Sequence, residues 1–108
     1  MSKRRPSALE AEFVRQFKAL HLPPAVAEYR FCERRWRVDF AWPSAKPPVA
    51  VEIEGFGHHK LNRYRSDVEK YNHLAIAGWI LIRITAPMLN DLSWEPLLRQ
   101  ALKLEALP

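Results

Sequence analysis

The chain has very little cysteine and no long apolar run. Its single cysteine, Cys32, excludes an internal disulfide and a multi-cysteine zinc site, which fits a reducing compartment. No apolar stretch approaches the roughly 18 residues that a membrane span needs. The basic start MSKRR is followed by PSALEAEF, which lacks the apolar core of a signal peptide. We therefore expect a soluble, cytoplasmic protein with no membrane partner.

Glycine is also scarce, and the chain has no internal repeat or low-complexity linker. The three glycines all lie between Gly55 and Gly78, far from both ends. A chain of 108 residues has room for one domain with a real core, but not for a separate recognition module. We expect a single domain over residues 1–108.

Acidic side chains are fewer than basic ones. Twelve Asp and Glu stand against 17 Lys and Arg, which gives a net charge of +5. Eleven of the basic residues are arginine, whose planar guanidinium matches the geometry of phosphate. This balance fits a polyanionic partner such as nucleic acid, although such an excess is also common among soluble proteins.

The spacing of apolar residues predicts a mixed α/β fold. Ser7 and Glu10 form a capping-box pattern at the start of a helix, and Gly78 ends a second one. The run WILIRIT is typical of a strand buried on both faces, and Ser93 is positioned to cap a last helix. The order α-β-β-β-α-β-α predicts a mixed four-stranded sheet flanked by helices. We expect helices over residues 7–21 and 62–77 and after Ser93, and strands over residues 28–31, 36–42, 49–54 and 79–85.

Three carboxylates fall where two neighbouring strands would bring them together. Glu52 and Glu54 share one face of the strand VAVEIE, and Asp39 lies on the preceding strand between Val38 and Phe40, which point to the other face. Like charges in one place raise one another's pKa, and a hard divalent cation with oxygen ligands neutralises them. The pattern indicates a Mg²⁺ site, with Mn²⁺ as a substitute. Polar residues that alternate along a strand also fit a plain solvent-facing side.

Glu10 has two roles open to it. It can be the return half of the Ser7 capping box. Helical spacing also sets it near the face of Phe13 and Phe17, so it can look inward at the strands. The two roles are compatible.

The order of elements, with Glu10, Asp39 and Glu52-Ile53-Glu54, resembles the PD-(D/E)XK nuclease superfamily over nearly the whole chain. The segments RRWRVDFAWP, VAVEIEGFGHH and DVEKYNHLAIAGWILIRIT also resemble small phage and prophage endonucleases. Among these are archaeal-type Holliday junction resolvases and very-short-patch-repair-like nucleases. The resemblance implies a restriction-endonuclease-like core and a bacterial or phage-infected host cell.

The resemblance also implies roles for single residues. Asp39 and Glu52 would bind the metal, the main-chain carbonyl of Ile53 would be a further ligand, and Glu10 would complete the shell through water. The superfamily usually has lysine where this chain has Glu54, so the catalytic base or charge stabiliser has to be sought elsewhere.

Lys70 is our substitute for that lysine, because some relatives carry the lysine on the second helix, which packs beside the site. An exposed lysine paired with Asp67 fits the same position. His58 is a candidate to move a proton or hold a phosphate, and an ordinary loop histidine is the alternative. Glu54 stays a candidate for placing the attacking water.

Basic residues flank the predicted site in three stretches, at 2–5, 34–37 and 58–65. Such side chains contact phosphates and position a nucleic acid without reading its sequence. The candidates for DNA contact are Lys3, Arg4, Arg5, Arg34, Arg35, Arg37, His59, Lys60, Arg63 and Arg65.

These residues together predict metal-assisted hydrolysis of a DNA phosphodiester. The sequence has no helix-turn-helix, zinc finger or spare domain to read bases, which favours an enzyme that selects DNA by shape. We expect a Holliday junction resolvase of DNA recombination and repair that acts as a homodimer. The leucines of the last helix and Trp94 would either form the dimer interface or pack on the sheet. The alternatives are a nicking endonuclease for mismatched or damaged duplex and a non-catalytic DNA-binding module.

Overall fold

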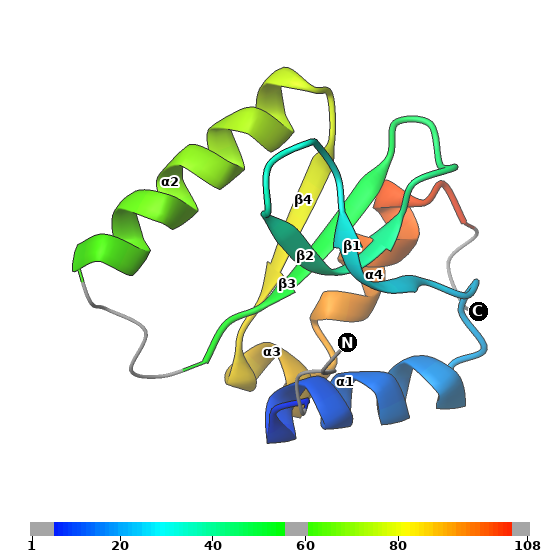
Figure 1. Ribbon diagram of the computed structural model, residues 1–108. Coiled ribbons are helices and arrows are strands. Elements are labelled where there is room, and N and C mark those ends of the chain that lie inside the picture. Colours follow the sequence, from blue (N-terminus) through cyan, green and yellow to red (C-terminus); the bar gives the residue numbers. More distant parts are fainter. Residues whose placement is uncertain (1–5, 56–60, 105–108) are drawn as a thin grey trace.

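The centre of the fold is a sheet whose four strands follow one another in chain order, β1-β2-β3-β4 (Figure 1). β1 (Val26–Arg30), β2 (Arg37–Trp42) and β3 (Val49–Ile53) are antiparallel neighbours, and β4 (Ile80–Ile84) runs parallel to β3. The computed structural model describes the backbone of residues 6–55 and 61–104, and their side chains except those of residues 61–64. The predicted α/β class with a mixed four-stranded sheet is confirmed.

The first helix begins at the predicted cap. α1 (Ala8–Ala19) follows Ser7, whose hydroxyl oxygen accepts a hydrogen bond from the Glu10 N–H at 3.1 Å. This bond satisfies one of the first N–H groups of the helix, which have no partner within it.

The second helix ends at the predicted glycine. α2 (Leu61–Ile76) connects β3 to β4, and Gly78 behind it has a φ of +84°. The N–H groups of Gly78 and Trp79 donate to the carbonyls of Ala75 and Leu74 at 3.1 and 3.0 Å. This pattern closes the last turn of the helix and requires the left-handed conformation that glycine adopts without strain.

Two short helices follow β4, where the sequence predicts one. α3 (Ala86–Asp91) was not predicted, and α4 (Trp94–Ala101) starts after Ser93 as expected. Ser93 occupies the N-cap position, but its side chain makes no capping hydrogen bond. α3 has only six residues, too few to show a helical period.

Helices cover both faces of the sheet. On one face α1, α3 and α4 pack around Phe13, whose ring centroid lies 5.0 Å from that of Phe40 and 4.9 Å from that of Trp94. On the other face α2 buries Leu74 against Ala41 and Ala50. Figure 1 shows α2 apart from the other three helices. No helix within the described residues is both long and apolar enough to cross a membrane.

Two predictions about strand faces are wrong. The segment 79–85 was expected to be buried on both faces, but β4 is an edge strand and Arg83 is exposed. The strand with a continuous buried run is instead β3, which lies inside the sheet and is buried from Val49 to Glu52. Val38 and Phe40 were expected to point to the same face of the sheet. Val38 instead packs with Leu74 on the face under α2, whereas Phe40 packs on the other face.

The apolar residues of the last helix were expected either to form a dimer interface or to pack on the sheet, and most of them pack on the sheet. Trp94 and Leu98 are fully buried in the core, so they are not available for a dimer interface. Leu97 is 46% exposed and remains available.

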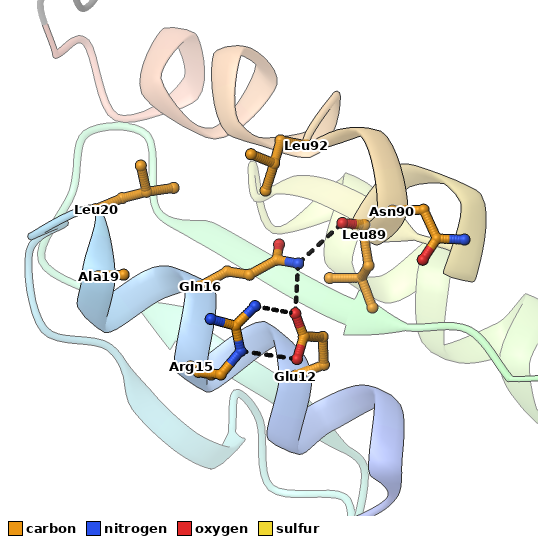
Figure 2. A pocket seen from close by; sticks show the side chains of 8 residues that line it. All are labelled: Glu12, Arg15, Gln16, Ala19, Leu20, Leu89, Asn90 and Leu92. Carbon is orange, nitrogen blue, oxygen red and sulfur yellow. Dashed lines mark hydrogen bonds and ion pairs between the residues drawn. The ribbon is translucent and has the colours of Figure 1, made fainter.

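A buried glutamine joins α1 to the last two helices. Gln16 Nε2 donates to the Leu89 carbonyl at 2.9 Å and to Glu12 Oε2 at 2.8 Å, and Gln16 Oε1 accepts from Trp94 Nε1 at 2.7 Å. Figure 2 shows Gln16 reaching from α1 toward Glu12 and Leu89 at a groove that also contains Leu92. Because Gln16 is only 8% exposed, water cannot easily replace these bonds.

Replacing Gln16 with leucine should therefore destabilise the fold. We expect the free energy of unfolding to fall by about 2–3 kcal/mol, because the Leu89 carbonyl and the Trp94 N–H lose their partner in a buried place. Urea unfolding monitored by tryptophan fluorescence measures this change. Arg15→Gln, in an exposed pair with Glu12, is the control and should change stability much less. Equal unfolding midpoints for Gln16→Leu and the wild type would refute the role given to Gln16.

Candidate active site

Backbone pairing between β2 and β3 stops before Asp39, and from there carboxylate side chains accept the hydrogen bonds that cross the two strands. The paired register ends with Phe40 opposite Val51. Beyond it the Asp39 N–H donates to Glu52 Oε2 at 3.0 Å, and the Ile53 N–H donates to Asp39 Oδ2 at 2.7 Å. Each carboxylate thus accepts an N–H from the opposite strand, a strong bond because the acceptor carries charge. The structure brings the two predicted acids together.

Glu52 is the buried member of this acid pair, with 7% of its surface exposed. Burial and, to a smaller extent, the charge of Asp39 raise the pKa of its carboxyl, while Lys70 lowers it; the net result is a pKa of about 7. A carboxyl perturbed by both burial and a specific neighbour is typical of functional sites.

Lys70 reaches the acid pair from α2. Its ammonium donates to Glu52 Oε1 and, at 3.1 Å, to the Arg37 carbonyl. The side chain is 12% exposed, and Leu74 one turn later is buried on the same side of the helix. Lys70 is therefore not the exposed lysine that the sequence also allowed.

Glu54 has its own partners next to this pair. Its Oε1 accepts from Arg83 Nε at 2.6 Å and from the Tyr71 hydroxyl at 3.2 Å. Burial raises the pKa of Tyr71 far above its usual range, so the hydroxyl keeps its proton. Glu54 thus ties the end of β3 to β4 and α2.

Sequence reasoning included Arg83 in the pattern that resembles very-short-patch-repair-like nucleases but gave it no role in the site, and it did not single out Tyr71. Arg83 is the register partner of Glu52 on β4, and its Cζ lies 4.8 Å from the centroid of the Tyr71 ring. The signal that could have found it is its place as the single charged residue of the apolar run WILIRIT. Tyr71 carried no such signal, because it fits the apolar stripe of the helix.

The acid pair has the donor chemistry of a hard cation site. The Asp39 and Glu52 carboxylates offer oxygen ligands, and the Ile53 main chain lies against Asp39. Glu10 is buried on α1, where its carboxylate accepts from the Ser7 hydroxyl at 3.3 Å. Among the residues that the structure describes, no three His, Cys, Asp or Glu side chains are arranged to hold a metal ion. The metal and the role of Glu10 stay predictions.

The arginines of the β1–β2 turn fall into two groups. Arg34 is engaged: its guanidinium lies 4.2 Å over the Trp36 ring and 3.9 Å from Glu69. Arg35 and Arg37 are exposed, and no other described residue forms a hydrogen bond or ion pair with their side chains. Arg37 is the first residue of β2 and stands two residues before Asp39, so it is the nearest of the three to the acid pair along the chain.

The remaining predicted contacts are only partly covered. Arg65 is exposed on α2, and Arg63 lies on the same helix but its side chain is not among those described. Six predicted site residues lie outside the described residues: Lys3, Arg4, Arg5, His58, His59 and Lys60.

Comparison with known proteins gives no match to a family model, a curated protein or a solved structure. The resemblance to PD-(D/E)XK nucleases therefore stays a prediction, and so does the restriction-endonuclease-like core.

Replacing Lys70 with methionine would remove the cation from Glu52 and keep most of the side-chain volume. At pH 8 we expect the free energy of unfolding to fall by about 3 kcal/mol, because a buried carboxylate beside Asp39 then lacks a cationic partner. The Glu52 pKa is raised in the folded state, to about 7, so the folded protein binds a proton that the unfolded chain releases above its ordinary pKa of 4.5. The loss should therefore be smaller at pH 5 and should grow as the pH rises through 7.

Urea unfolding at pH 5 and pH 8 measures both effects, with the exposed Lys18→Met on α1 as control. A loss of the same size at both pH values would contradict the assignment of Glu52 as the group that Lys70 neutralises.

Proposed function

We propose that the protein is a metal-dependent DNA endonuclease that hydrolyses phosphodiester bonds in branched DNA, above all in four-way junctions. The observation that carries this proposal is the acid pair Asp39–Glu52, in which Glu52 is buried and has Lys70 beside it, at the point where backbone pairing between β2 and β3 stops. Two adjacent carboxylates favour a divalent cation, and the amine adds a positive charge for a phosphate.

Asp39, Glu52 and the Ile53 carbonyl are the groups that would hold Mg²⁺ or Mn²⁺. A bound cation of this kind polarises a phosphate and lowers the pKa of a water molecule. The protein's own part is positional. Backbone N–H groups orient both carboxylates, and Lys70 balances their charge next to the place where a phosphate would lie.

The surface around the site suits DNA. Arg37 is exposed, and its carbonyl accepts a hydrogen bond from Lys70 of the site. Arg35 is exposed two residues earlier in the chain, which carries a net charge of +5. The described residues all belong to one sheet and its covering helices, which leaves no second unit among them for base reading. These features favour recognition of shape through phosphates. Cutting both strands of a junction symmetrically would require a homodimer, to which Leu97 is free to contribute.

A non-catalytic DNA-binding module is the second candidate. The observation that favours it is that Lys70 already neutralises Glu52, as a structural ion pair would. Dependence on metal separates the two functions, because binding through phosphates alone does not require a divalent cation.

Incubation of the protein with a labelled four-way junction and a matching linear duplex, each with Mg²⁺ or EDTA, tests the proposal. We expect paired, symmetric cuts only in the junction and only with metal, as seen on a denaturing gel. Equal cutting of the duplex would indicate a general or lesion-directed nuclease. Binding of the junction without any cut would establish the non-catalytic module.

Asp39→Asn should reduce cleavage by at least roughly 100-fold, since loss even of groups behind the metal ligands costs 10–100-fold. Junction binding should stay the same or become tighter, because a negative charge near the phosphates is lost. Gel-shift and single-turnover cleavage assays measure the two effects separately. Glu12→Gln is the matched acid-to-amide control, because Glu12 is a partly exposed acid of α1 that pairs with Arg15, and it should cut like the wild type. Full activity of Asp39→Asn would remove Asp39 from the site.

A further inference from the structure

Arg83 places a second cation beside the acid pair, and the mechanism above gives it no role. It is the register partner of Glu52 in the parallel β3–β4 pair. Ile82 and Ile84 are buried on the opposite face of β4, so Arg83 lies on the face that α2 covers. Its side chain is nevertheless 55% exposed, because β4 is the edge strand. Arg83 therefore lies beside Glu52 in the sheet, on the same face, with its side chain partly in solvent.

The guanidinium is held from two sides. Its Nε donates to Glu54 Oε1 at 2.6 Å, and its Cζ lies 4.8 Å from the centroid of the Tyr71 ring. The Tyr71 hydroxyl donates to the same Glu54 oxygen at 3.2 Å, so the two supporting residues also fix each other. A long side chain that is ordered before its ligand arrives loses less conformational entropy on binding.

The bonding groups that remain fit a phosphate. A guanidinium has five N–H donors in a planar fork, and Glu54 takes only the one on Nε. No described residue forms a hydrogen bond with either Nη atom. Two parallel N–H groups of such a fork bind two oxygens of one phosphate at once, which a lysine cannot do.

We propose that Arg83 binds a phosphate of the DNA at the candidate active site, and that Glu54 and Tyr71 are positioning residues that orient its guanidinium. The proposal rests on the proposed function and deepens it. It also accounts for the glutamate at position 54, where the resembled superfamily has lysine. In this protein the positive charge would come from Arg83 on the neighbouring strand, and Glu54 would orient its guanidinium.

Junction binding in EDTA over a series of salt concentrations tests the role of Arg83. Arg83→Gln should weaken binding and reduce the slope of log K against log salt by about 0.9, the change for one lost phosphate contact. Arg83→Lys should keep the slope, because the charge remains, and should bind between the wild type and Arg83→Gln. Arg15→Gln is the matched control, since Arg15 is also exposed and also pairs with a glutamate at 2.6 Å. A wild-type slope for Arg83→Gln would overturn the proposal.

A double-mutant cycle tests the positioning role of Glu54. Removal of a negative charge strengthens DNA binding by itself. Glu54→Gln should nevertheless weaken binding when Arg83 is present, and it should not weaken it further in Arg83→Gln. Tyr71→Phe, which keeps the ring and loses the hydroxyl, should act in the same direction to a smaller extent. Additive losses in the double variant would show that Glu54 does not act through Arg83.

Two further readouts keep the outcomes apart. Circular dichroism and the urea midpoint show whether each variant is folded. If Arg83→Gln is unfolded, the affinities of Arg83→Lys and Tyr71→Phe decide: weaker binding than the wild type supports the proposal, and wild-type affinity of both overturns it. A wild-type protein that neither binds nor cuts the junction would end both the proposed function and the role of Arg83. A wild-type protein that binds and cuts, with Arg83→Gln equal to Arg15→Gln, would end the role of Arg83 alone.

Discussion

The buried Glu52 carboxylate is the constraint on which the rest of the candidate site depends. A carboxylate taken out of water next to another carboxylate is unfavourable unless donors and a cation surround it. Two elements meet this requirement: β2 supplies the Asp39 N–H and α2 supplies the Lys70 ammonium. To do so, β2 and β3 give up backbone pairing beyond Phe40 and Val51. The site therefore forms at the place where backbone pairing between the two strands is given up.

The two faces of the sheet are held by different forces. The face under α1, α3 and α4 has a large apolar core centred on Phe13 and Trp94. On the other face, Leu74 is the one fully buried side chain among those described in α2. Lys70 and Tyr71 of α2 also make polar contacts with the glutamates at the end of β3, and Tyr71 packs in the same cluster as Leu74. α2 is thus held to the sheet both by apolar packing and by polar contacts with the site.

Most of the fold follows from local chemistry that the sequence displays. The Ser7 cap, the Gly78 terminus and the two faces of β3 each depend on residues within one turn or one strand, so pattern reading located them. α3 was missed because six residues carry no period. The burial of β4 was misjudged because an apolar run does not reveal whether a strand lies at the centre or at the edge of a sheet, which depends on pairing with distant strands.

The sequence by itself determined which residues carry the charges and, through the two-residue period of a strand, that Glu52 and Glu54 share a face. Only the tertiary structure decided how those charges pair. Lys70 joins Glu52, while Glu54 turns to Arg83 and Tyr71. The partners come from elements separated by more than a dozen residues, and ion pairing depends on distance in space rather than along the chain. Local periodicity can therefore place a carboxylate on a face, but strand register and helix packing select the cation that it meets.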